Sequence, residues 1–179
     1  MAEFLWIFWS FSLLGWVLER LFAAVTRSPR RRRRCLLLLP LCPVYGLGMA
    51  AVLALPPSLR SGWPLYLWGG LTATSVEYIY HWWGETFLGV SFWDYTGVFG
   101  NFRGRVCLPF SLAWGLLLFP AVYLVTPPVV ALAGRVPIGV TWWLLLAFTA
   151  DAVCSLRFLA VTHDLEALRA VIWPVSADR

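Results

Sequence analysis

Long apolar stretches dominate the pattern of hydrophobic and polar positions along the 179-residue chain. A helix needs roughly 20 mostly apolar residues to cross a bilayer, and apolar runs of that length without alternation favour helices over strands. Segments of this kind cover about 4–26, 36–57, 63–89, 105–126 and 138–160. We therefore predict an all-α membrane protein, in which residues 1–160 form one domain, a bundle of about five transmembrane helices.

We predict a membrane helix at the start of the chain and a short tail at its end. The sequence begins MAEFLWIF, without a basic leader or a small-residue cleavage site, so we interpret the first span as a helix and not as a signal peptide. In the tail, 161–179, Leu165, Leu168 and Trp173 alternate with charged residues. This pattern predicts a short amphipathic helix at the cytoplasmic membrane surface, with a partner-binding helix as the alternative.

Composition supports a membrane protein. Hydrophobic residues make up 60% of the chain and charged residues 13%, and the mean hydropathy is +0.74. These values lie outside the range of soluble globular domains. Little sequence remains outside the predicted spans, so a soluble catalytic domain is excluded.

The positive charges predict the orientation of the bundle. All 14 basic residues are arginines, and Arg27 and Arg30–Arg34 lie between the first two spans. A short loop this basic stays in the cytoplasm, which places the N-terminus outside and the C-terminus inside a bacterial cytoplasmic membrane. We expect Arg30–Arg34 to contact anionic lipids. Such a run also occurs in nucleic-acid-binding and nuclear-import segments, but between two spans it favours topology and no nucleic-acid partner.

Several ionisable residues lie within the predicted spans. Counting 1.5 Å per residue from the cytoplasmic ends places Glu19, Glu77 and Asp151 about 10, 18 and 13 Å deep, and Glu85 near the inner interface. A carboxylate at a helix centre costs about 2.5 kcal/mol or more on insertion scales. Glu77, His81 and Glu85 form one polar stripe. We expect these groups to face the bundle interior, with Arg105 or Arg20 offsetting their charge.

The second span contains a break in its helical pattern. Pro40 and Pro43 cannot donate backbone hydrogen bonds, and Gly46 and Gly48 loosen the following turn. We therefore predict a helix that is kinked or starts late. Freed carbonyl groups are tolerated at membrane depth only against protein or a wet cavity, so the break either lines a substrate path or is a simple kink at a helix entrance.

The loop between the third and fourth spans, SFWDYTGVFGNFRGR, is short and rich in glycine and aromatic residues. Its polar residues Asp94, Asn101, Arg103 and Arg105 can bind one another or nearby helix ends. Three glycines permit tight turns, at Gly97, Gly100 and Gly104. The loop is either a structural plug or a gate and docking surface for a cytoplasmic partner.

The cysteines predict no redox or metal site. Cys35, Cys42, Cys107 and Cys154 include no C-x-x-C pair. The first three fall near the predicted cytoplasmic side, which is reducing. We therefore expect them to pack as small apolar side chains.

Several motifs together carry a resemblance to a known family. LGWVLER, RCLLLLPLCPVYGLG, EYIYHWWGETFLGVSFWDY and GNFRGRVCLPFSLAWGLL resemble, in order and spacing, the bacterial family of putative ABC-transporter type IV permeases. The resemblance covers roughly residues 10–120. It implies a transport subunit, and since the chain has no G-x-x-x-x-G-K-[ST] phosphate loop, it implies a separate ATPase. It also implies a second copy of the subunit, because five helices make a thin wall for a pathway.

The matching positions define the candidate site. They are Gly15, Trp16, Glu19, Cys42, Pro43, Tyr45, Gly46, Gly48, Glu77, Glu85, Trp93, Asp94, Tyr95, Gly104, Arg105, Trp114 and Gly115. The chain departs from the pattern at Leu39, Arg103 and His81, and Asp151 lies beyond the similar region. We expect a polar cluster of Glu19, Tyr45, Glu77, Glu85, Asp94, Tyr95 and Arg105, with His81 and Asp151 as weaker candidates.

Three functions fit these residues. The first is a permease in which the carboxylates and the Pro-Gly break line a path for substrate or protons. The second is a membrane-embedded enzyme that uses paired carboxylates as acid and base, or Glu77, His81 and Glu85 as metal ligands. The third is a structural or regulatory protein whose charges only pair. Eight residues of helix span about 12 Å, too far for one ion unless the helix breaks at Gly84. We therefore expect no metal, and we assign no cofactor and no catalytic residue.

Overall fold

The structure of the protein is a computed structural model that describes residues 1–26 and 35–170. The arginines Arg30–Arg34 and the end of the tail lie outside the described residues, so the predicted lipid contacts stay a prediction. The described part is mostly helical.

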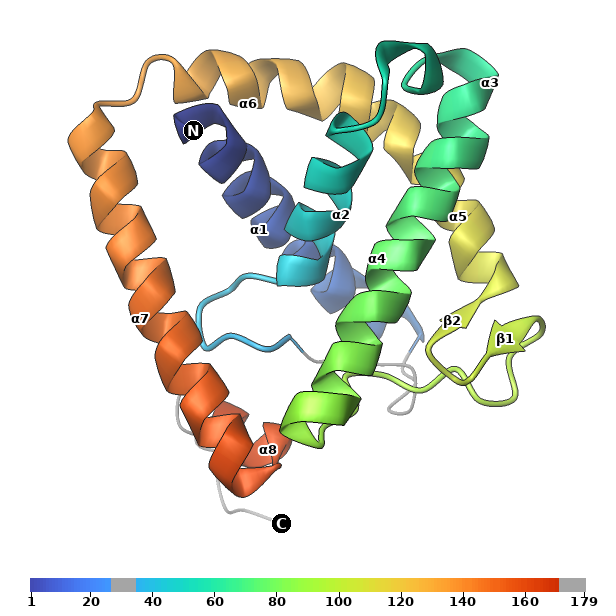
Figure 1. Cartoon of the computed structure of the whole chain (residues 1–179), viewed down its shortest axis with the longest axis vertical. Coiled ribbons are helices and arrows are strands. Elements are labelled where there is room, and N and C mark those ends of the chain that lie inside the picture. Colours follow the sequence, from blue (N-terminus) through green and yellow to red (C-terminus); the bar gives the residue numbers. More distant parts are fainter. Residues whose placement is uncertain (27–34, 171–179) are drawn as a thin grey trace.

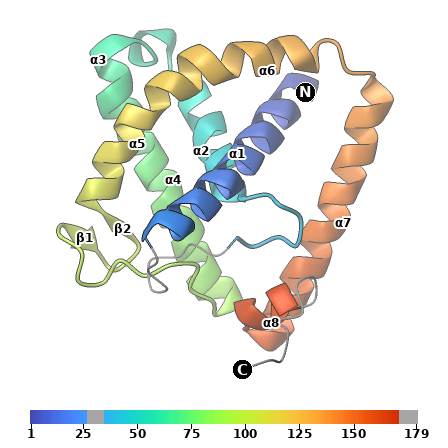
Figure 2. The same ribbon diagram turned by 180° about the vertical axis from the view of Figure 1, so that it is seen from behind.

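The helices form an open, roughly triangular frame (Figure 1). The elements of this frame are α1 (Ala2–Thr26), α2 (Pro43–Leu53), α4 (Gly70–Trp83), α5 (Leu108–Pro120), α6 (Thr126–Ala133) and α7 (Ile138–Thr162). In Figure 1, α4 and α7 descend on opposite sides and approach each other beside α8 (Leu165–Ala170), while α6 crosses the top. From behind, α1 runs diagonally across the frame (Figure 2), and it packs against α2, α6 and α7.

Three of the described helices are long and apolar enough to cross a membrane: Ala2–Thr26, Leu108–Ala133 and Ile138–Thr162. They correspond to the predicted spans 4–26, 105–126 and 138–160. The helix Leu108–Ala133 includes α5, the π-helical segment η4 (Ala121–Val125) and α6. It changes direction along its length (Figure 1), and Pro120 and the π-helical turn that follows are the usual causes of such a bend.

The predicted third span is a helical run without a break. It consists of α3 (Gly62–Pro64), the π-helical segment η2 (Leu65–Gly69), α4 and the π-helical segment η3 (Gly84–Leu88). Gly89, with φ of 66°, ends the run. This run is not among the three candidate spans, since it contains Glu77, His81 and Glu85 together with several tyrosine, tryptophan and glycine residues of low hydropathy.

The predicted second span is helical only in its later part. Helix α2 has 11 residues and begins at Pro43, so at 1.5 Å per residue it is about 16 Å long, roughly half the hydrocarbon thickness. Residues 35–42 are non-helical. Pro40 disfavours helix at the preceding residue, and Pro43 is at the first helical position, where its missing N–H costs nothing. Of the two outcomes predicted for the break, the late start is confirmed.

The connections lie at alternate ends of the frame. The N-terminus, the loop with η1 (Pro57–Leu59) and the turn between α6 and α7 lie at one end, and α8 and the β-hairpin at the other (Figure 1). This alternation agrees with the order of spans predicted from the sequence. Which end faces the cytoplasm stays a prediction, as does the five-helix bundle.

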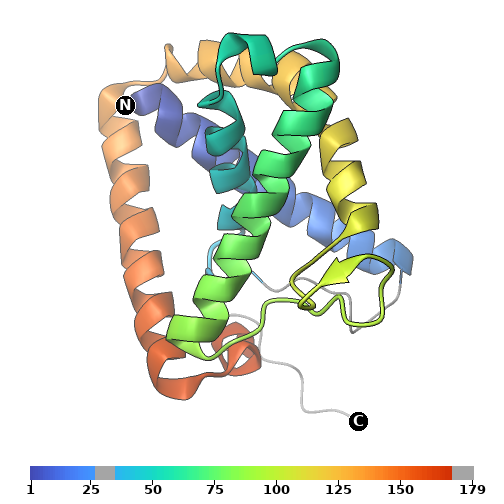
Figure 3. The ribbon, with the colours of Figure 1, turned by 45° about the vertical axis from the view of Figure 1, so that its right-hand side comes forward.

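The loop predicted between the third and fourth spans ends in a two-stranded hairpin. Strands β1 (Asn101–Phe102) and β2 (Val106–Cys107) pair antiparallel beside the start of α5 (Figure 3). The three glycines at 97, 100 and 104 have φ of 83°, 63° and 68°, a region that other residues rarely adopt. The prediction that they make tight turns is confirmed.

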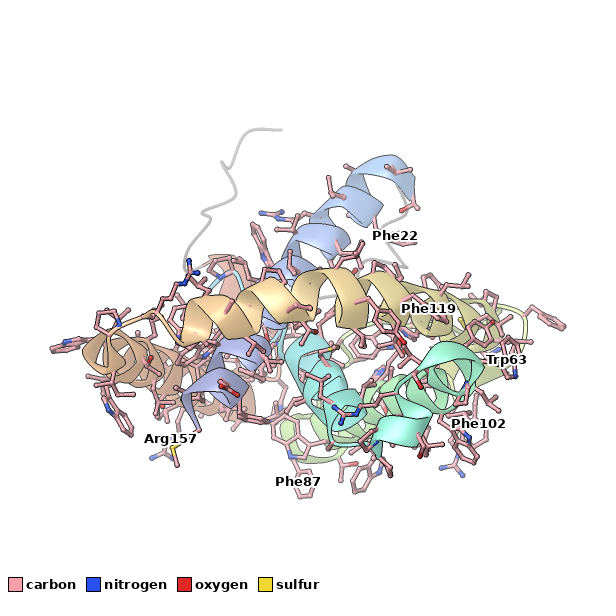
Figure 4. All side chains as sticks on the ribbon, turned by 90° about the horizontal axis from the view of Figure 1, so that it is seen from above. Phe22, Trp63, Phe87, Phe102, Phe119 and Arg157 are labelled. Carbon is pink, nitrogen blue, oxygen red and sulfur yellow. A yellow bond between two sulfur atoms is a disulfide. The ribbon has the colours of Figure 1, made fainter. Side chains whose placement is uncertain are left out.

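Two apolar clusters hold the frame together. The cluster near the hairpin end includes Phe92, Trp93, Tyr95, Leu159 and Leu168. The second is centred on Phe11, Met49, Val52, Leu65 and Leu118. Seen from above, α6 passes over α1, and the exposed side chains of Phe87 and Trp63 point outward (Figure 4).

The start of the tail is docked to the fold. Leu165 and Leu168 of α8 are 4% and 1% exposed and belong to the cluster near the hairpin. The amphipathic pattern of this segment therefore reflects packing against the protein in its described part.

Candidate functional site

Asp151 of α7 holds the non-helical segment 35–42 in place. Its carboxylate accepts hydrogen bonds from the backbone N–H groups of Leu38 and Leu39, at 3.1 and 3.0 Å, and from the hydroxyl of Ser155 at 3.1 Å. Irregular backbone at membrane depth is stable only where its polar groups have partners. Asp151 is therefore a structural acceptor, separate from the other predicted site residues.

A disulfide closes the same segment. Cys35 and Cys42 are bonded, with 5.1 Å between their Cα atoms. The expectation that they pack as free apolar side chains is wrong, because the bends of the non-helical segment bring together two cysteines that a helix would keep apart. Disulfides persist in oxidising compartments, so the redox state of this pair in cells reports which side of the membrane it faces.

Glu19 and Tyr45 join α1 to α2. The Tyr45 hydroxyl donates a hydrogen bond to the Glu19 carboxylate, and Glu19 is 9% exposed. The Tyr45 ring lies directly over Gly15, where a Cβ atom would come within 2.2 Å of it. Glycine at 15 is thus the residue that lets Tyr45 reach Glu19.

Glu77 is the most buried carboxylate of the predicted cluster, at 2% exposure. Its carboxylate accepts hydrogen bonds from the indole N–H of Trp114 in α5, at 2.7 Å, and from the hydroxyl of Tyr95, at 3.3 Å. Gly70 and Gly115 allow α4 and α5 to approach closely, because a Cβ on Gly70 would lie 3.3 Å from the Cα of Gly115. The sequence had marked Trp114 as a family position but had not indicated its hydrogen bond to Glu77.

The two carboxylates face one crevice between α1, α2, α4 and α5. Tyr45 and Trp114 meet edge to face with ring centroids 5.3 Å apart, and both line two adjoining cavities. The larger cavity, of about 370 Å³, has Glu77 in its wall, and the smaller, of about 190 Å³, has Glu19 and Tyr95. Leu18 and Leu117 also border both cavities.

The Pro-Gly break contributes to this crevice. Gly48 lies in the wall of the larger cavity, and a Cβ added to it would meet no atom within 4 Å. Gly46 differs, because a Cβ there would lie 2.4 Å from the Phe8 carbonyl oxygen and from the Ser12 hydroxyl. Gly46 permits close packing against α1, whereas Gly48 leaves open space.

Arg105 pairs with Glu85. Its Nε and Nη2 atoms both lie 2.7 Å from Glu85 Oε2, and its Nη1 donates to the Tyr78 hydroxyl at 2.8 Å. The hydrogen bond with Glu85 raises the pKa of the Arg105 guanidinium, against the opposing effect of burial. The structure shows no direct Arg105–Glu77 ion pair; Arg105 binds Glu85, two turns along the same helix stripe.

His81 is fully buried at the hairpin end of α4, at 1% exposure. Its Nε2 lies 3.1 Å from the Ser91 hydroxyl and 3.4 Å from Glu85 Oε1. Both contacts use one nitrogen, so this is not the relay in which a histidine bridges a hydroxyl and a carboxylate through opposite ring atoms. Within residues 1–26 and 35–170, no three His, Cys, Asp or Glu side chains are grouped to hold a metal ion.

The WDY loop, residues 93–95, is anchored to the fold by two of its side chains. Trp93 and Tyr95 are 4% and 1% exposed, and the indole N–H of Trp93 donates to the Arg105 carbonyl at 2.7 Å. Asp94 is exposed and accepts the N–H of Thr96 at 2.8 Å, within its own turn. The loop therefore supports the site through Tyr95, while Asp94 lies outside it.

The predicted residues thus fall into three groups. Glu19, Tyr45, Glu77 and Tyr95 surround the crevice, with Trp114 added by the structure. Glu85, Arg105 and His81 form a second group with Tyr78 and Ser91, which carried no signal in the sequence beyond their positions beside charged or aromatic residues. Asp151 and Asp94 each stabilise local backbone.

Exchanging the charges of Glu85 and Arg105 tests this pairing. Glu85→Arg and Arg105→Glu are each expected to lower the free energy of unfolding by roughly 1–2 kcal/mol, because each leaves a partly buried charge beside a like charge. The double exchange should recover about half of the summed loss. Chemical unfolding in detergent micelles measures the coupling.

The matched control combines Glu85→Arg with Arg103→Glu. Arg103 is an exposed neighbour in the same hairpin, so this pair should show no recovery. Equal recovery with Arg103 would mean that general electrostatics, and not the Glu85–Arg105 contact, sets the energy.

One family of known proteins matches a region of the chain that contains all the crevice residues. The family model described as "Putative ABC-transporter type IV" matches residues 6–156, which include the crevice and the hairpin. The chain belongs to this family. Neither a curated protein nor a solved structure matches it. Membership in the ABC-transporter type IV family, with three apolar helices of membrane-spanning length, indicates a membrane protein of a transport system.

Proposed function

We propose that this chain is the permease subunit of an ABC transport system in a bacterial cytoplasmic membrane, and that the crevice lines part of the substrate's path. The observation that carries the proposal is the position of Glu77, a 2% exposed carboxylate in the wall of an otherwise apolar cavity of about 370 Å³. Intramembrane carboxylates of this kind mark substrate or proton pathways by default.

A separate ATPase would dock at the hairpin, with that end of the frame in the cytoplasm. The hairpin presents two exposed aromatic side chains, Phe99 and Phe102, which are 77% and 57% exposed. Exposed apolar side chains at the end of a membrane bundle suit a protein partner. A second copy of the chain would complete the path, because Leu14, Val17 and Leu18 border the larger cavity and are also exposed.

A structural function is the second candidate. Both oxygens of Glu77 accept hydrogen bonds from neighbouring side chains, which is also the arrangement expected of a buried polar group that only specifies helix packing. The two candidates differ in what removal of the charge does. A path residue can lose its charge without loss of the fold, whereas a packing residue cannot.

Co-purification after mild extraction tests the proposal. We expect an ATPase to bind the wild-type chain in stoichiometric amount and to be lost from the double variant Phe99→Ser, Phe102→Ser. Trp63→Ser is the control, because Trp63 is 72% exposed at the opposite end and should leave the ATPase bound. Glu77→Gln should keep the ATPase and the fold but abolish transport-coupled ATP hydrolysis.

Two outcomes would count against the permease. If no ATPase accompanies the wild-type chain, the transport proposal loses its energy source. If Glu77→Gln unfolds the chain in detergent, the structural candidate is favoured.

A further inference from the structure

The Cys35–Cys42 disulfide lies at the end of the frame for which the arginines predict a cytoplasmic location. Arg34 directly precedes Cys35 in the sequence and ends the arginine run that predicts a cytoplasmic loop. Leu36 and Leu37, between the two cysteines, are 6% and 7% exposed and belong to the apolar cluster near the hairpin and α8. The packing therefore groups the bond with the hairpin end of the frame.

The cytoplasm is a reducing compartment, and this limits what a disulfide there does. Glutathione and thioredoxin-type proteins keep cytosolic thiols reduced, and the disulfides that do form are usually transient and catalytic or redox-sensing. A bond between Cys35 and Cys42 on this side of the membrane therefore forms and opens with the redox state of the cell.

The bond closes a short loop, so it contributes little as a permanent cross-link. The two cysteines are 7 positions apart in the sequence, and in the chain-entropy model a disulfide stabilises a protein less when the loop that it closes is shorter. The segment is also held by the burial of Leu36 and Leu37 and by the hydrogen bonds from Leu38 and Leu39 to Asp151. Opening the bond is therefore expected to loosen the segment without unfolding the chain.

The two sulfur atoms differ in accessibility. Cys35 is partly exposed, whereas Cys42 is 3% exposed. An attacking thiolate therefore reaches the Cys35 sulfur first, and Cys42 becomes the leaving group. Cys42 is also the N-cap residue of α2, and the N-terminus of a helix favours negative charge, which suits a departing thiolate.

Cys42 connects the bond to the start of α2. Its backbone N–H donates to the Ser12 carbonyl of α1 at 2.9 Å, and its carbonyl accepts the N–H of Tyr45 at 3.1 Å. The Tyr45 side chain reaches Glu19 from this first turn. Movement of Cys42 therefore shifts both the first turn of α2 and a side chain that joins α2 to α1.

We propose that Cys35 and Cys42 form a reversible redox switch, in which a cytoplasmic dithiol reductant opens the disulfide and thereby releases segment 35–42 and the start of α2. A thiolate of the reductant bonds to the Cys35 sulfur, the Cys35–Cys42 bond breaks, and the Cys42 thiolate leaves and takes up a proton. The second thiolate of the reductant then attacks the mixed disulfide and frees Cys35, which is also protonated. Two electrons pass to the protein, the reductant leaves as a disulfide, and the reverse exchange closes the bond.

The first test measures the redox state of the pair in growing bacteria that express the full chain. Acid quenching and alkylation with a maleimide of known mass report the oxidised fraction. We expect the pair to be mostly reduced, to become oxidised within minutes of adding the thiol oxidant diamide, and to be reduced again after diamide is washed out. A pair that stays oxidised throughout, or that never oxidises, would overturn the proposal. In the first case, reduction by a membrane-impermeant phosphine added to spheroplasts would place the bond outside.

The second test measures what opening the bond does to the segment. Hydrogen–deuterium exchange compares the oxidised full chain with the dithiothreitol-reduced full chain, both in nanodiscs. We expect at least tenfold faster exchange at the N–H groups of Leu38, Leu39 and Cys42, which are hydrogen-bonded to Asp151 and Ser12 in the structure. Peptides from α5 should exchange equally in both states. Equal exchange of the segment in both states would contradict the proposal.

Two variants separate the bond from other effects of the reductant. Cys35→Ser removes the bond, so it should exchange as the reduced wild type does, with or without dithiothreitol. Cys154→Ser removes a free, exposed cysteine of α7 and should respond to dithiothreitol as the wild type does. A response that persists in Cys35→Ser would assign the effect to another site and refute the switch. If Cys35→Ser does not fold, the comparison of oxidised and reduced wild type decides, since it needs no substitution.

Discussion

Replacing Asp151 with leucine is expected to lower the free energy of unfolding by about 3 kcal/mol. The leucine side chain has a similar size but cannot accept the N–H groups of Leu38 and Leu39 or the hydroxyl of Ser155. An N–H group without a partner at membrane depth costs about as much as one buried in protein, roughly 1–3 kcal/mol, and two of these three donors are backbone groups that cannot turn away. Chemical unfolding in detergent, followed by circular dichroism, measures the loss.

Asp151→Asn is the matched control for charge. Asparagine keeps one acceptor oxygen in the same position, so it should cost about half as much as leucine. If asparagine and leucine are equally damaging, the negative charge, and not hydrogen-bond acceptance, stabilises the segment. If neither destabilises the protein, segment 35–42 does not depend on α7.

Gly46→Ala is expected to destabilise the protein by about 3 kcal/mol, while Gly48→Ala, two residues later in the same helix, should not. The added methyl group at 46 would lie 2.4 Å from the carbonyl oxygen of Phe8. This oxygen belongs to the backbone of α1 and cannot move without shifting that helix, and overpacking costs typically 1–3 kcal/mol. The shift would also strain the hydrogen bond from Tyr45 to Glu19.

Gly48→Ala provides the internal control. Alanine there meets open space and gains up to about 1 kcal/mol of helix propensity over glycine. Thermal unfolding of both variants in one detergent compares them directly. Equal effects of the two substitutions would contradict the close contact of α1 and α2 at Gly46.

The sequence predicted the helices best where an apolar run continues without proline or a break. The predicted spans 4–26 and 138–160 agree within a few residues with Ala2–Thr26 and Ile138–Thr162, because an apolar run forms the same helix whatever it packs against. The glycine turns of the hairpin were also predictable, since a positive φ is a local requirement. The start of the second helix was less predictable, because two prolines allow either a kink or a late start.

Contacts between residues distant in the sequence could not be predicted from the sequence pattern. Arg105 could have met Glu77 or Glu85, which lie on one stripe of the same helix, and only the position of the hairpin selects Glu85. The Cys35–Cys42 bond was missed because the two cysteines lack C-x-x-C spacing and were expected near the reducing side of the membrane. The bends of the non-helical segment 35–42 bring them together. The hydrogen bond from Trp114 to Glu77 likewise depends on how closely α4 and α5 approach.

The sequence by itself determined that this is a helical membrane protein with costly carboxylates in its apolar segments, because hydropathy and charge are properties of each residue in its own surroundings. Only the tertiary structure decided which carboxylate does what. Asp151 binds backbone, Glu85 binds Arg105, and Glu77 and Glu19 face a common crevice. The physical reason is that a carboxylate's function depends on which donors and cavities lie within a few ångströms, and packing of helices distant in sequence sets those distances.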